Sequence, residues 1–198
     1  MITLRPVVEL PGRRPDRWLT LHGACPPEEV EAFVEALVAY LDVEAPAGPR
    51  DAVAALLREE MLIVAGGLRL HDSATGATVS PGCCAGLEDW RQWADVLTGG
   101  APWLGHDPWP EITPHGDLLR VWQHGGAERR GPYVDLTRAE LARLLLGAQA
   151  DLVGFLGRLD RWAYDVGATA AALVAAVDRD FAVTAPLALP EEGSTTST

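Results

Sequence analysis

Apolar residues recur at helical spacing in the part of the chain that follows Pro26-Pro27. They stand at i, i+3, i+4, i+7, i+8 and i+11 from Val30 to Leu41, which predicts a helix with one buried face. Proline followed by Glu28-Glu29 is typical of a first helical turn, where acidic side chains favour the positive end of the helix dipole. Similar spacing predicts further helices over 50–60, 87–97 and 168–180.

A longer helix is expected after Thr137. Thr137 and Glu140 have the spacing of a capping box, and apolar residues then hold one face for more than 20 residues, from Leu141 to Trp162. Three glycines lie within this segment, and each costs about 1 kcal/mol relative to alanine. We expect these residues to bend or split the helix: Gly147, Gly154 and Gly157.

Short apolar runs bounded by proline, glycine and aspartate predict strands. The predicted strands are 2–10, 18–22, 61–64, 68–71, 78–80, 118–124 and 133–136. Residues 101–116, rich in proline, glycine and tryptophan, predict a loop. Strands and helices do not alternate as in βαβ units, so we expect an α+β fold: a mostly antiparallel sheet with helices packed on it and a C-terminal helical pair. We expect one domain over 1–189 and a disordered tail over 190–198.

The composition excludes several kinds of chemistry. All sixteen basic residues of the 198 are arginine, and a phosphate-binding Walker lysine or a Schiff-base lysine needs an amine. Only Ser73 and Ser80 precede the tail, and neither lies in a GxSxG motif. Gly66-Gly67 is not part of a GxGxxG fingerprint. The sequence therefore supports neither serine hydrolysis nor dinucleotide binding.

The remaining features suggest a cytoplasmic protein. Residues 1–18 contain no signal-peptide apolar region, and the longest apolar stretch, 168–177, is about half of a membrane span. Three cysteines are too few for a disulfide framework, so we expect reduced thiols. The net charge of −12 repels phosphate groups. Neither nucleic acid nor a membrane is an expected partner.

Acidic residues concentrate in the first predicted helix. Between residues 18 and 49 the chain has six carboxylates and no arginine. Four of them share the face opposite the apolar one: Glu28, Glu31, Glu35 and Asp42. Two interpretations stay open. The face can be a solvated surface that keeps the protein soluble, or a docking surface for a basic protein partner.

Cys83 and Cys84 directly precede the helix predicted over 87–97. A thiol at the positive end of a helix dipole favours the thiolate and would be reactive. However, Glu88 and Asp89 oppose a thiolate there, and no CxxC motif is present. Small cysteines that fill a tight turn are the alternative interpretation.

The densest group of aromatic and polar residues lies in the predicted loop, and its members are Trp103, His106, Asp107 and Trp109. We expect the loop to fold back over the strands predicted at 68–71 and 78–80, so that these residues would line any ligand pocket, with the cysteines or His71 as the opposite wall. The alternative is a loop held over the core by its tryptophans. No HxxxH or HExxH spacing occurs, so the sequence predicts neither a metal nor a cofactor.

Three functions remain compatible with the sequence. The first is a non-catalytic binding protein, such as an inhibitor, immunity protein or adaptor, whose acidic helix binds a basic partner. The second is a small-ligand-binding protein or enzyme that uses the Cys83-Cys84 turn and the 103–111 loop. The third is a structural or accessory subunit with a tryptophan-rich interface. The first is our preferred hypothesis, and catalysis is not expected.

Overall fold

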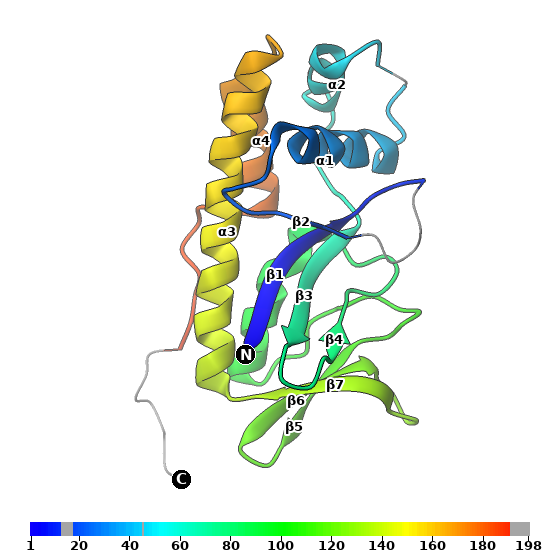
Figure 1. Cartoon of the computed structure of the whole chain (residues 1–198), viewed down its shortest axis with the longest axis vertical. Coiled ribbons are helices and arrows are strands. Elements are labelled where there is room, and N and C mark those ends of the chain that lie inside the picture. Colours follow the sequence, from blue (N-terminus) through cyan, green and yellow to red (C-terminus); the bar gives the residue numbers. More distant parts are fainter. Residues whose placement is uncertain (13–17, 45, 191–198) are drawn as a thin grey trace.

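The computed structural model describes residues 1–12, 18–44 and 46–190. Within these residues the fold is α+β: two antiparallel sheets, helices packed against them, and a C-terminal helical pair. This confirms the predicted class, although the strands are divided between two sheets (Figure 1). All but the first residue of the predicted tail lies outside the described residues.

The first sheet has the strand order β2-β1-β3-β4. Its central strand β1 (Ile2–Glu9) pairs antiparallel with β2 (Trp18–Thr20) on one side and with β3 (Gly66–Asp72) on the other. A short hairpin continues from β3 to β4 (Thr78–Val79). The prediction of a strand over 61–64 was wrong, since this segment is irregular and β3 pairs with β1 instead.

The second sheet consists of β5 (Glu111–His115), β6 (Leu118–His124) and β7 (Arg130–Leu136), in that order. The end of the predicted loop over 101–116 is thus a strand. Its proline, Pro114, is compatible with β5 because β5 is an edge strand and does not need every backbone N–H for the ladder. The high proline content of residues 101–116 led to the prediction of a loop where β5 forms.

The predicted acidic helix is α1 (Pro27–Tyr40), and a shorter helix, α2 (Pro49–Leu56), follows it. The apolar face of α1 is buried in the core, with Phe33 and Leu37 fully enclosed. Because α1 ends at Tyr40, Asp42, the last of the four predicted acidic residues, lies outside the helix.

The helix predicted over 87–97 is a 3₁₀ helix, η1 (Leu87–Thr98). Such a helix has three residues per turn, and its main buried side chains follow that period: Leu87, Trp90, Trp93 and Val96. The prediction of an α-helix with 3.6 residues per turn was therefore wrong for this segment. Buried Trp90 donates its indole N–H to the backbone oxygen of Phe181 at 2.8 Å, which joins η1 to the C-terminal helix.

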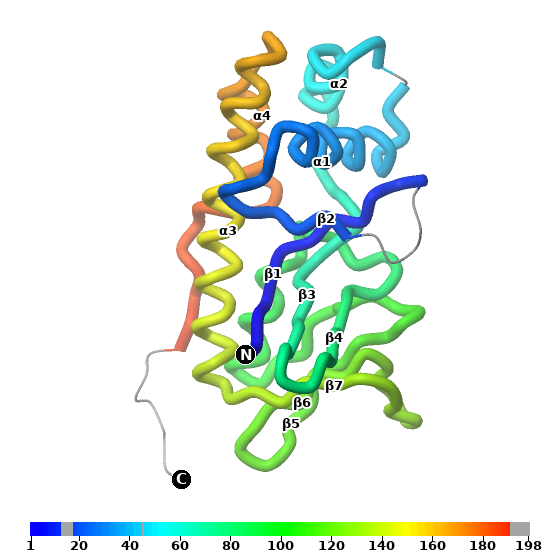
Figure 2. The backbone as a smooth tube through the Cα atoms, in the orientation of Figure 1, coloured from blue at the N-terminus to red at the C-terminus, as the bar shows by residue number. Residues whose placement is uncertain are grey.

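The C-terminal pair consists of α3 (Arg138–Asp165) and α4 (Ala170–Phe181). The predicted capping box is present at the start of α3, and the three glycines do not split the helix. In Figure 2, β1 lies between α3 and β3, and α3 packs against β1. Among the described residues, no helix has the length and apolarity needed to cross a membrane.

Candidate functional site

Three of the predicted acidic side chains form an exposed face on α1, which we call the acidic face: Glu28, Glu31 and Glu35. Within the described ranges, no arginine forms an ion pair with any of them. Asp42 was expected on the same face but lies beyond the end of α1, where its φ of 52° turns the chain away from the helix. It is also exposed.

A groove with an apolar floor lies beside the acidic face. Its volume is about 240 Å³, and its lining comes from α1, α2, the segment between them and α3. Glu31 and Glu35 contribute carboxylates, whereas Val34, Val38 and Trp162 contribute apolar surface. Pockets for drug-sized ligands are usually about 300–1,000 Å³. This groove therefore suits one or two side chains of a protein partner better than a cofactor.

The other two acidic residues line separate hollows. Glu28 lies with Trp18 and His22 beside β2. Asp42 lies with Glu44 and other charged residues where the chain passes from α1 to α2. Of the predicted set of four, Glu28, Glu31 and Glu35 thus lie on one face of α1, and Glu31 and Glu35 line the same groove.

The loop after η1 folds back and meets the turn before it. Cys83 and His106 exchange two backbone hydrogen bonds, of 2.6 and 3.0 Å, and the Gly82 amide donates to the Leu104 oxygen at 2.8 Å. Two glycines permit this approach: a Cβ on Gly82 would lie 2.2 Å from the Pro108 oxygen, and one on Gly105 would lie 2.5 Å from the carbonyl carbon of Gly82. The predicted fold-back of the loop is present.

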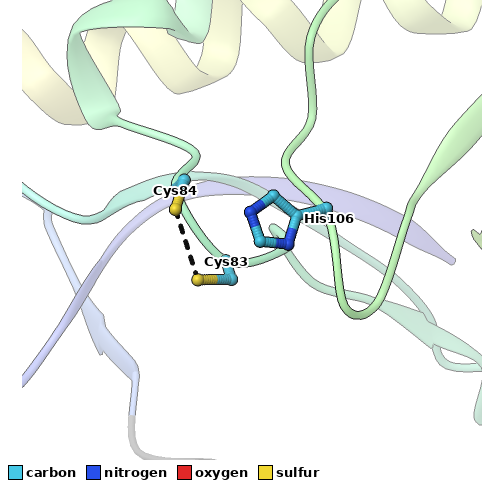
Figure 3. Close-up of side chains that lie close together, drawn as sticks. All are labelled: Cys83, Cys84 and His106. Carbon is cyan, nitrogen blue, oxygen red and sulfur yellow. Dashed lines mark hydrogen bonds between the residues drawn. The ribbon is translucent and has the colours of Figure 1, made fainter.

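This contact brings three ligand-type side chains together, which we call the loop cluster: Cys83, Cys84 and His106. The two sulfurs are 3.4 Å apart, and one ligand atom from each of the three residues lies within 4.8 Å of the others. Figure 3 shows the imidazole ring beside the cysteines, with one nitrogen turned toward them. Both cysteines are exposed and His106 is partly buried.

The other predicted pocket residues surround the cluster on its outer side. Oδ2 of Asp107 lies 3.3 Å from Nδ1 of His106, and the rings of Trp103 and Trp109 pack edge to face, with centroids 6.2 Å apart. Both tryptophans are exposed. His71 takes a different partner, the Thr78 hydroxyl at 2.9 Å, and contributes nothing to the cluster.

Cys83 does not have the electrostatics of an activated nucleophile. Hydrogen bonding to Cys84 and desolvation raise the pKa of Cys83, and the carboxylates of Glu9 and Asp107 raise it further. A nucleophilic cysteine needs the opposite, a lowered pKa. This direction is opposite to the lowering expected for a thiol at a helix N-terminus, which removes the reason for assigning a reactive thiol to Cys83.

The space behind the loop is too small for an organic ligand. Trp103 and Leu104 help to line a cavity of about 20 Å³ between the first sheet and η1, which is room for a single water molecule. Trp103 is the one predicted pocket residue in its lining. The predicted residues therefore come together as an open surface cluster and not as the walls of this cavity.

A second group of ligand-type residues was not predicted from the sequence: His22, Cys25 and Glu29. Cys25 is buried, and burial raises its pKa to about 11. Its thiol donates to the Thr20 oxygen at 3.4 Å, and His22 Nδ1 accepts the Ala24 amide at 3.1 Å. These atoms serve the turn before α1, so we interpret the group as structural.

Comparison of the chain with family models, curated proteins and solved structures gives no match. The features of the structure that bear on function are therefore the acidic face and the loop cluster.

Proposed function

We propose that the protein is a non-catalytic binding protein that recognises a basic, amphipathic segment of another protein through α1 and the adjoining groove. Inhibitors, immunity proteins and adaptors act in this way. The observation that carries the proposal is the combination of carboxylates and apolar floor in one groove, with Glu31 and Glu35 beside Val34, Val38 and Trp162.

Repulsion among the carboxylates of α1 favours a role in binding a basic partner over a role in solubility alone. Like charges one turn apart on a helix destabilise it by a few tenths of a kcal/mol, and no described arginine offsets Glu28, Glu31 or Glu35. A partner's arginine or lysine would offset this repulsion on binding. An apolar side chain of the same partner would bury the groove floor at about 25 cal/mol per Å².

A fluorescence anisotropy titration tests this proposal. The probe is a labelled amphipathic peptide of arginine and leucine, and the reference is the same peptide with glutamate in place of arginine. We expect binding of the arginine peptide only, with an affinity that falls as salt is raised. In the triple variant Glu28→Gln, Glu31→Gln, Glu35→Gln the affinity at low salt should fall at least tenfold.

A matched control separates the acidic face from net charge. The triple variant Asp95→Asn, Asp117→Asn, Glu128→Gln removes three exposed carboxylates that lie outside α1 and changes the net charge equally. It should retain binding to within about twofold. Equal loss in both triple variants, or no binding of the arginine peptide to the unmodified protein, would refute the proposal.

One observation supports the alternative function, a ligand-binding protein or enzyme: Cys83, Cys84 and His106 lie close together. The small cavity beside the loop and the raised pKa of Cys83 do not favour an organic substrate or a thiolate nucleophile. That cluster is better explained by a different kind of ligand.

A further inference from the structure

We propose that Cys83, Cys84 and His106 form a binding site for one thiophilic divalent metal ion, with zinc as the expected ion. This site is separate from the acidic face and does not depend on the function proposed above. Its ligand set of two sulfurs and one imidazole is a set that zinc accepts. Three protein ligands leave the fourth tetrahedral position for water or an external ligand.

The backbone at Cys84 makes the two adjacent cysteines usable as a pair. Neighbouring side chains of an extended chain point to opposite sides, so adjacent cysteines do not normally bind one ion. Cys84 has a φ of 63°, in the left-handed region that few residues other than glycine adopt. The resulting turn places both sulfurs on one side of the chain, 3.4 Å apart (Figure 3).

The distance between the two sulfurs is close to that expected when both bind one zinc ion. Zinc lies about 2.3 Å from each thiolate in a tetrahedral site, which puts two such sulfurs about 3.8 Å apart. The observed 3.4 Å is close to this value and well above the roughly 2.05 Å of a disulfide bond. The remaining ligand separations are within 4.8 Å, and rotation of exposed side chains about χ1 can shorten them.

Asp107 supplies the outer partner that metal-binding histidines usually have. Such a histidine donates its second ring N–H to a carboxylate or carbonyl, which fixes the tautomer. Nδ1 of His106 lies 3.3 Å from Oδ2 of Asp107, so the proton belongs on Nδ1 and the lone pair of Nε2 is free for the ion. In Figure 3 a ring nitrogen is turned toward the cysteines. Asp107 is thus a positioning residue.

Binding is a ligand exchange with no redox change. Each thiol releases its proton to solvent as a zinc–sulfur bond forms, Nε2 forms the third bond, and the hydrated ion releases all but one of its waters. The backbone bridge between Cys83 and His106 holds two of the three ligands in place before binding. The expected stoichiometry is one zinc and two released protons per chain.

Cobalt titration of the full-length, tag-free, reduced protein tests the site. We expect one cobalt per chain with thiolate-to-cobalt charge-transfer absorption, displaced by one equivalent of zinc. Cys83→Ser, Cys84→Ser and His106→Gln should each weaken zinc binding at least tenfold. Circular dichroism of each variant shows whether it is folded, and because all three side chains lie on the surface or at its edge, we expect native spectra.

Two controls complete the design. His115→Gln removes an exposed imidazole outside the cluster and should leave zinc affinity unchanged. Asp107→Asn should weaken zinc about tenfold without changing the cobalt spectrum, and Asp107→Glu should restore affinity. The proposal is wrong if the unmodified protein shows no thiolate-to-cobalt absorption, or if neither serine variant weakens zinc binding. Either result leaves the peptide-binding proposal unaffected.

Discussion

A left-handed backbone at Cys84 is the smallest feature on which the loop cluster depends. The sequence identified Cys83, Cys84 and His106 as candidates and predicted that the loop folds back toward the cysteines. It did not predict a metal site, because 22 positions separate Cys84 from His106 and no metal motif has that spacing. The close approach of Gly82 and Gly105 brings them together. Loop closure of this kind is a tertiary property, and residue spacing does not encode it.

The partly buried carboxyl of Glu88 makes the stability of the protein depend on pH. Desolvation raises its pKa, so the carboxyl holds its proton more tightly in the folded protein than in the unfolded chain. The stability that Glu88 contributes is present below its unfolded pKa of about 4.3 and is lost as pH rises through the folded value. Relative to Glu88→Gln, the unmodified protein should therefore become less stable as pH rises from about 4 to about 7.

Urea unfolding at these two pH values measures this difference in the free energy of unfolding. Glu59→Gln, a change at an exposed glutamate, is the control and should show no comparable trend. A difference between the unmodified protein and Glu88→Gln that is constant with pH would contradict the role assigned to burial.

Among the elements, helices with strong apolar periodicity were predicted well and elements with ambiguous patterns were not. The apolar face of α1 and the capping box of α3 carry clear local signals. In η1, Leu87 and Trp90 fit both a three-residue and a 3.6-residue period, and packing of Trp93 and Val96 decides for the former. The strand β5 was missed because Pro114 resembles a loop signal.

The glycines of α3 yield a prediction about this helix. A Cβ added at Gly147 or Gly157 would meet open space, whereas a Cβ on Gly154 would lie 2.9 Å from the Cα of Gly23. Gly147→Ala and Gly157→Ala should each raise the free energy of unfolding by about 0.5–1 kcal/mol. Gly154→Ala should lower it by about 1–3 kcal/mol, because it forces α3 away from the segment before α1.

Chemical denaturation of the three variants checks these signs, with Gly147→Ala as the matched helical control for Gly154→Ala. Stabilisation by Gly154→Ala would mean that the contact between α3 and Gly23 is loose. Such a result would contradict the predicted displacement of α3 from the segment before α1.

In the whole molecule, α3 starts directly after β7 of the second sheet, passes β1 of the first sheet and continues to α1 (Figure 1). This arrangement sets Trp162 of α3 beside Glu31 and Glu35 of α1. The sequence predicted the acidic face but not the groove, because the groove joins residues about 130 positions apart. The separation into two sheets is also a long-range property that strand patterns do not specify.

The most direct test of the binding account is ¹⁹F NMR of the protein labelled with fluorotryptophan. The chain has seven tryptophans, and Trp162→Phe assigns the resonance of the groove. On addition of the arginine and leucine peptide, we predict that the Trp162 resonance shifts while those of Trp103 and Trp109 do not. A peptide that binds and shifts Trp103 or Trp109 but leaves Trp162 unchanged would contradict the account.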